Sequence, residues 1–172
     1  MDIDAIAAWA EIINAAAVTL TLLGLIVTIR QNARSQKAMA VDSLAAAIAS
    51  INVPATQSPA LGSAIASAVN DWASATREER IMAHYFLFSF FKLHESAWYQ
   101  LRAGILDAEQ WQGWEKSIRR FYHTRGVREV WWPNRRQAYS AEFQAFLAGT
   151  SPPEGFGSLV EIFDFAPDRA AS

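Results

Sequence analysis

The sequence predicts an all-α fold in which one N-terminal transmembrane helix continues into a cytoplasmic bundle of four to five helices. An uncharged, mostly apolar run extends over 18 residues from Ile12 to Ile29. Further along the chain, apolar residues recur at helical spacing, and each such stretch follows residues that favour helix N-termini. No segment longer than the "SLVEIFDF" near the C-terminus has β-strand character. These three observations together favour helices throughout.

The composition narrows the classes of function. Charged residues make up 19% of the 172 residues and the net charge is −2, so no overall positive field attracts nucleic acid, and no nucleic-acid partner is expected. The chain has no cysteine, which excludes disulfides, thiolate metal sites and a cysteine nucleophile.

The run at 12–29 has the length of a membrane span. At about 1.5 Å per residue it measures roughly 27 Å, close to the roughly 30 Å hydrocarbon core of a bilayer. Trp9 and Glu11 precede it, where they would reach the headgroups. A cleaved signal peptide fits poorly, because Asp2, Asp4 and Glu11 make the start acidic. The alternative is a buried helix of a soluble core.

The charges after the run predict its orientation. Arg30, Arg34 and Lys37 follow it with no acid between them, which suits contact with anionic lipid headgroups. The positive-inside rule then leaves residues 1–11 as a short extracytoplasmic N-terminus and the rest of the chain in the cytoplasm. We expect a single-pass protein of the bacterial inner membrane, with membrane lipids as partners.

The helix is expected to continue through a basic juxtamembrane extension, residues 30–52, because neither Gly nor Pro occurs there. One of its faces carries Leu20, Leu23 and Val27 and would contact lipid. Another face carries only small or polar side chains, which is typical of close helix packing in a bilayer. This helix-packing seam consists of Asn14, Ala17, Thr21, Gly24 and Thr28. The partner would be another membrane protein or a second copy. The alternatives are that an Ala/Thr-rich composition places these residues there by chance, or that the stripe packs on the chain's own domain beyond residue 31.

A cytoplasmic helical domain is predicted at 53–149. Pro54 and Pro59 indicate a loop, after which Ser58 caps a helix whose apolar face ends at Trp72. Thr76 and Glu79 form a capping box that begins the central core helix, 77–103.

Gly104 is expected to end the central helix, and Asp107 with Gln110 to cap the next one, which Gly126 would break. A short helical turn would stop before Pro133, because proline disfavours helix in the residue before it. A last helix is expected at 134–148, ending at Gly149, followed by a tail at 150–172 that docks on the domain.

Four stretches, "LIVTIRQNARS", "GILDAEQW", "RGVREVWW" and "YSAEFQAF", resemble an uncharacterised family of small bacterial proteins. Members have one N-terminal transmembrane helix and a helical cytoplasmic domain. The resemblance covers most of residues 18–148. It implies membrane anchoring and a helical body, and it transfers no activity and no functional residue.

No catalytic, metal-binding or cofactor-binding residue is predicted. His84, His94 and His123 match no metal-ligand spacing such as HExxH, so core or surface positions are the favoured interpretation. Glu95 stands in the most apolar helix. It either faces solvent or pairs with an arginine such as Arg102 or Arg119, and a structural role is favoured over catalysis.

Residues 119–136 combine a local net charge of +5 with interleaved aromatics. The candidate partner surface within them is Arg128, Trp131, Trp132, Arg135 and Arg136. A structural role, with arginines outside and aromatics in the core, is weighted most. An acidic partner protein, an anionic leaflet and single-stranded nucleic acid are the alternatives. The sequence leaves open whether Trp131 and Trp132 are core or interface.

The predicted function is that of a non-catalytic, membrane-anchored accessory or scaffold protein. Its span would pack on a partner helix and its domain would dock on a membrane complex. One alternative is a membrane-anchored signalling or sensory module, in which the continuous helix transmits a shift. Another is a membrane-bound enzyme of an unrecognised type.

Overall fold

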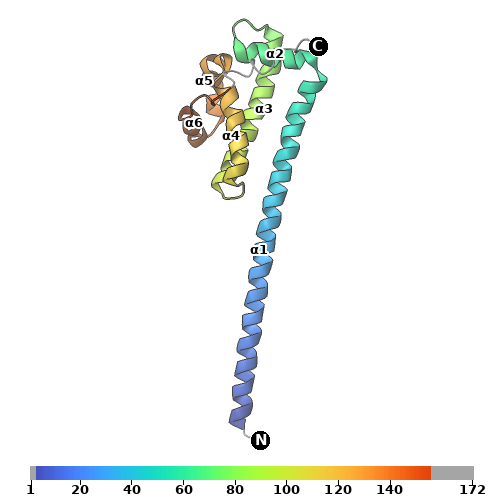
Figure 1. Ribbon diagram of the computed structural model, residues 1–172, viewed down its shortest axis with the longest axis vertical. Helices are drawn as coiled ribbons and strands as arrows, with labels where there is room; N and C mark the ends of the chain where they lie inside the picture. Colours follow the sequence, from blue (N-terminus) through green and yellow to red (C-terminus); the bar gives the residue numbers. More distant parts are fainter. Residues whose placement is uncertain (1–2, 156–172) are drawn as a thin grey trace, which may run out of the picture. The chain divides into compact units, whose positions relative to one another are not determined.

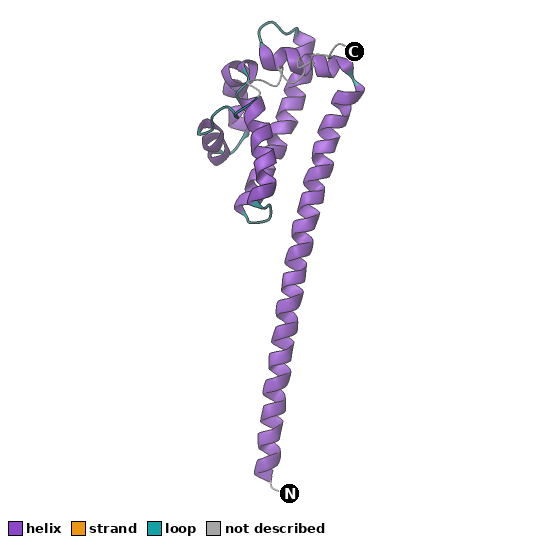
Figure 2. Cartoon of the chain, in the orientation of Figure 1, coloured by secondary structure: helices purple, strands orange, loops and turns teal. Residues whose placement is uncertain are grey.

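The computed structural model describes residues 3–155, with the side chains of 5–8 and 55 excepted, and confirms the all-α class (Figures 1 and 2). All regular elements in this range are helical. In order they are α1 (Ile3–Gln57), α2 (Pro59–Asn70), α3 (Arg77–Arg102), α4 (Ala108–Tyr122), a π-helical segment η1 (Gly126–Trp131), α5 (Trp132–Arg135), a 3-10 turn η2 (Arg136–Ala138) and α6 (Ala141–Ala148).

Helix α1 belongs to two structural units that divide between Ala40 and Val41. In the first unit every residue from 9 to 39 is exposed. In the second unit the C-terminal part of α1 contributes to the domain core, where Leu44 is buried. The predicted loop at Pro54 is wrong, because the helix runs through it to Gln57. A proline so near the C-terminus removes only one of the last helical hydrogen bonds, and its carbonyl still accepts one from Ser58 N at 3.0 Å.

The predicted helix caps are confirmed. The Ser58 side chain accepts a hydrogen bond from Leu61 N at 3.3 Å and so starts α2. Thr76 and Glu79 exchange side-chain and backbone hydrogen bonds of 3.2 and 2.7 Å at the start of α3. Each cap satisfies backbone N–H groups that have no partner inside the helix.

The ends of the next two helices fit the sequence as well. Gly104, with φ +69°, follows α3 in the left-handed conformation that favours glycine. Asp107 and Gln110 form the second predicted capping box, at the start of α4.

The segment after α4 differs from the prediction. Helix α4 ends at Tyr122 rather than at Gly126, and Gly126 instead begins η1. The expected stop before Pro133 is wrong, because Pro133 lies in the first turn of α5, where its missing N–H costs nothing. The helix expected at 134–148 is also divided. Ser140 accepts a hydrogen bond from Phe143 N at 3.3 Å and thereby caps a separate α6, which Gly149 ends as predicted.

Gly126 lies at a close approach between η1 and α2. A Cβ at this position would stand 1.9 Å from the carbonyl oxygen of Ala68. Its φ is not positive, so the glycine is required by space rather than by backbone conformation.

The domain core is aromatic and centres on α3, which lies beside α2 and α4 (Figure 1). The Phe91 ring is fully buried, with centroids 5.2 Å from Trp131 and 5.3 Å from Trp132. Burying one such side chain contributes about 1.5–3 kcal/mol, and an aromatic pair adds about 0.5–1.5 kcal/mol. Phe143 and Leu147 of α6 complete this side of the core.

Candidate functional site

The exposed surface of α1 is the first candidate. The helix contains an 18-residue window with a mean hydropathy of 2.3, none of which is buried. Large side chains along it stay uncovered, among them Ile13 at 65% and Leu20 at 69% exposure. Monomeric soluble proteins rarely expose a continuous apolar surface of this extent. The helix is long and apolar enough to cross a membrane.

The seam residues Asn14, Ala17, Thr21, Gly24 and Thr28 are all exposed. Thr21 Oγ1 donates to the Ala17 carbonyl at 2.8 Å, and Thr28 Oγ1 donates to the Gly24 carbonyl at 3.0 Å. These hydroxyls therefore keep only acceptor capacity for a neighbouring helix. A Cβ at Gly24 would meet nothing within 4 Å, which leaves the backbone open to close approach. The seam stays a prediction.

The three headgroup residues also lie on the surface of α1. Arg30, Arg34 and Lys37 are exposed, and they follow the apolar run 12–29 immediately and within about two helical turns. Their spacing of four and three residues places them on one face of the helix. Contact with lipid headgroups stays a prediction as well.

The candidate partner surface requires a correction at its two tryptophans. Trp131 is 2% exposed and Trp132 is 5% exposed, so both belong to the core rather than to an exposed surface. Both rings pack on Phe91, and the Trp132 ring also packs on Tyr139, so η1 and the start of α5 place them in the core. Arg128, Arg135 and Arg136 remain exposed.

Arg135 lines a cavity that the sequence pattern did not predict. This arginine groove has a volume of about 430 Å³, and its walls come from the segment after α2, the start of α3, η1 and α5. Its lining consists of Trp72, Arg77, Arg80, Ile81, His84, Tyr85, Val130, Trp131, Asn134 and Arg135. Arg77, Arg80 and His84 recur at helical spacing on α3, which is the signal that would have pointed to one face.

The arginine groove is positively charged and partly apolar. Three arginines and no acid line it, and the Tyr85 ring is 68% exposed. The Trp131 Nε1–H donates to His84 Nδ1 at 3.1 Å. Partial burial, together with the charge of Arg135, lowers the pKa of His84, so this histidine adds no charge at neutral pH. The surface fits an anionic partner.

Glu95 is buried and paired, but its partner differs from the one expected. Its carboxylate accepts from Lys92 Nζ at 2.8 Å and from Ser140 N at 2.7 Å, whereas Arg102 pairs with Glu142. Burial raises the pKa of Glu95, but the hydrogen bonds from Lys92 and Ser140 outweigh it and hold the pKa below the usual value. The carboxylate thus fastens the start of α6 to α3, which is a structural role.

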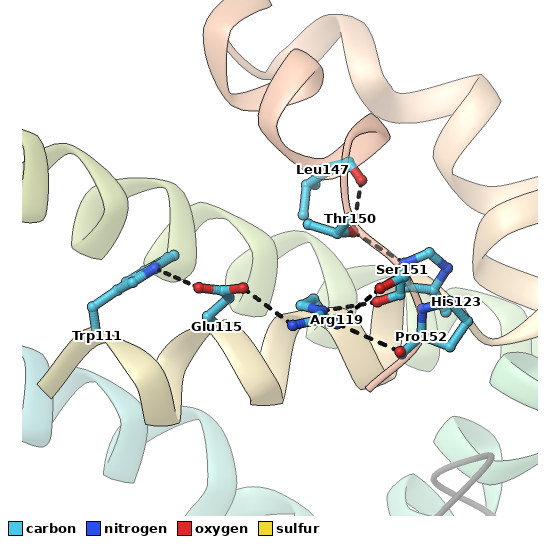
Figure 3. A network of polar contacts seen from close by, with 8 residues as sticks. All are labelled: Trp111, Glu115, Arg119, His123, Leu147, Thr150, Ser151 and Pro152. Carbon is cyan, nitrogen blue, oxygen red and sulfur yellow. Dashed lines mark hydrogen bonds and ion pairs between the residues drawn. The ribbon is translucent and has the colours of Figure 1, made fainter. Parts of the chain in front are cut away.

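Arg119, the other expected partner of Glu95, fastens the chain after α6 to α4 (Figure 3). Its guanidinium pairs with Glu115 at 3.2 Å and donates to the Ser151 carbonyl at 2.8 Å. His123 Nε2 lies 3.0 Å from Thr150 Oγ1. The start of the tail is therefore held on the domain, while the predicted docking of 156–172 lies outside the described residues.

The histidines do not gather into a metal site. Within residues 3–155 no group of three or more His, Asp or Glu side chains is arranged to hold a metal ion. His84 and His123 have protein partners, and His94 is fully buried.

The chain matches no family model, no curated protein and no solved structure among the known proteins with which it was compared. The family resemblance therefore stays a prediction.

Proposed function

We propose that the chain is a non-catalytic, membrane-anchored accessory protein. In this proposal α1 crosses the membrane, packs its seam on a neighbouring helix, and carries a domain that docks on the same complex. The observation that carries the proposal is the exposed apolar surface of α1, where an 18-residue window of mean hydropathy 2.3 has no cover within the described chain.

The proposed location is a bacterial inner membrane, with the N-terminus outside and the domain in the cytoplasm. The charges that flank the apolar window support this orientation. Asp4 and Glu11 precede it, and Arg30, Arg34 and Lys37 follow it. Basic residues accumulate on the cytoplasmic side of membrane spans.

The proposed docking surface on the domain is the arginine groove rather than the tryptophan pair. Its three guanidinium groups and the exposed Tyr85 suit an acidic segment of the partner, since arginine binds carboxylates with two parallel hydrogen bonds. Arginine and tyrosine are also the residue types enriched at protein interfaces.

The seam is tested by cross-linking in native membranes. A photoreactive residue at Thr21 is expected to give one discrete cross-linked product, because this position faces the partner helix. The matched control is a photoreactive residue at Leu23, two positions further on and on the lipid-facing side. Equal products from both positions, or lipid adducts alone from Thr21, would contradict the proposal. The mass of the product distinguishes a second copy from a foreign subunit.

The arginine groove is tested by charge reversal. Arg135→Glu is expected to reduce the recovery of the co-isolated partner at least fivefold, because truncating or reversing an anchor arginine commonly costs more than about 1 kcal/mol of binding free energy. Lys116→Glu, an exposed reversal on α4 outside the groove, is the matched control and should leave recovery unchanged. Equal recovery from the two variants would argue against docking through this groove.

A further inference from the structure

A second cavity lies within the domain unit, where the C-terminal part of α1 faces α3 and α4. It has a volume of about 420 Å³, and its lining includes Leu44, Ile48, His94, Gly113 and Trp114. This volume falls within the roughly 300–1,000 Å³ range of small-molecule sites, which are mostly apolar with a few polar groups. We call it the His94 pocket.

His94 presents an unused hydrogen-bond acceptor at this pocket. The side chain is fully buried, and its Nδ1 lies 2.8 Å from the carbonyl oxygen of Phe90. A carbonyl only accepts, so Nδ1 carries the proton and Nε2 presents a lone pair. Within the described chain Nε2 has no hydrogen-bond partner. A buried polar atom without a partner is unfavourable, so a donor that reached Nε2 would be bound with a clear gain in affinity.

The chemistry of the pocket selects the kind of molecule that would fill it. The His94 Nε2 lone pair requires a donor, which excludes a ligand head that only accepts. Apolar side chains around it, such as Leu44 and Ile48, disfavour a charged head. A neutral hydroxyl on an apolar body meets both conditions.

We propose that the His94 pocket binds an amphiphilic small molecule whose hydroxyl group donates to His94 Nε2 and whose apolar body packs on Leu44 and Ile48. Nε2 has no exposed surface, and the half-buried Trp114 packs edge-on against His94 at a centroid distance of 5.1 Å. A side chain beside His94, such as Trp114 or Phe90, therefore has to move for the hydroxyl to reach Nε2. The pocket lies wholly in the domain, so the proposal is independent of whether α1 crosses a membrane.

The test compares two probes of similar shape, 4-butylphenol and butylbenzene, which differ in the hydroxyl. The full chain, labelled with ¹⁵N in its histidine rings, is placed in lipid nanodiscs and titrated while the ring resonances are followed by NMR. The phenol is expected to shift the Nε2 resonance of His94 and to bind at least about tenfold more tightly than the hydrocarbon, since it alone satisfies the buried acceptor.

Two variants make the test specific. His94→Phe keeps an aromatic ring and removes the acceptor, so the preference for the phenol over the hydrocarbon should fall at least about tenfold. Because both probes partition into lipid equally with either chain, comparing the two chains also corrects for that partition. Gly113 lines the pocket and a Cβ there meets nothing within 4 Å, so Gly113→Leu adds bulk to the lining without a clash and should strongly weaken binding of both probes. The matched control is Gln112→Leu, an exposed position on α4 outside the lining.

Three results would overturn the proposal. These are equal phenol preference in the native chain and in His94→Phe, unchanged binding in Gly113→Leu, or no binding of either probe, as expected if only water occupies the pocket. Two sources could supply such a hydroxyl, a lipid with a free hydroxyl or a water-borne molecule. Adding diacylglycerol to the nanodisc distinguishes them, because competition with the phenol supports a lipid source and its absence supports a water-borne one.

Discussion

Gly126→Ala is expected to destabilise the domain by about 3 kcal/mol or more. The added Cβ would stand 1.9 Å from the Ala68 carbonyl oxygen and 3.0 Å from that of Val69. Both atoms belong to the backbone of α2, so no side-chain rotation relieves the overlap, and η1 must separate from α2. Overpacking of this kind costs about 1–3 kcal/mol, and more where backbone has to move.

The control for this prediction is Gly113→Ala on α4. Its Cβ meets nothing within 4 Å, so the usual helix preference for alanine should stabilise the domain by about 0.5–1 kcal/mol. Urea unfolding followed by tryptophan fluorescence measures both variants. A second substitution, Ala68→Gly, should not rescue Gly126→Ala, because the clash involves the carbonyl rather than the Ala68 side chain. Equal stability of the two alanine variants would refute the close approach.

The predicted helix caps were reliable because short-range interactions determine them, whereas the proline signals at Pro54 and Pro133 were misread as stops. The capping boxes at Thr76 and Asp107 need only residues three apart, and both are present. Gly104 likewise marks the end of α3 through its own backbone conformation. As far as residue 52, the α1 helix follows from a run of residues in which no proline occurs. Its apolar surface was therefore visible from composition alone.

The missed features depend on contacts between distant segments. Arg77 and Arg80 meet Arg135 only because the domain core brings the start of α3 to α5. Trp131 and Trp132 have the same flanking arginines whether they face the core or a partner, so their burial could not be read from the pattern. Gly126 was interpreted as a helix break, because its close approach to Ala68 depends on the tertiary structure and leaves no signal in the sequence. The pairing of Glu95 with Lys92 was missed although both lie on α3.

Acidification from pH 7 to pH 5 is expected to lower the free energy of unfolding, with His94 contributing about 2 kcal/mol of the loss. Burial lowers the pKa of His94 to about 4, against about 6.5 in the unfolded chain, although the hydrogen bond to Phe90 opposes the shift. At pH values between these two pKa values, His94 binds a proton in the unfolded chain but not in the folded chain. The contribution of His94 to the free energy of unfolding is therefore complete above pH 6.5 and is lost as the pH falls toward 4.

The His94→Phe variant isolates this contribution, since the other half-buried histidines, His84 and His123, also have lowered pKa values and act with the same sign. The free energy of unfolding is measured with urea for the full chain in nanodiscs at several pH values between 5 and 7. It should fall steeply with decreasing pH in the native chain and less steeply in His94→Phe. An identical slope in both would mean that His94 is hydrated when folded. A hydrated His94 would also leave Nε2 satisfied by water, which removes the reason for the pocket to select a hydroxyl-bearing ligand.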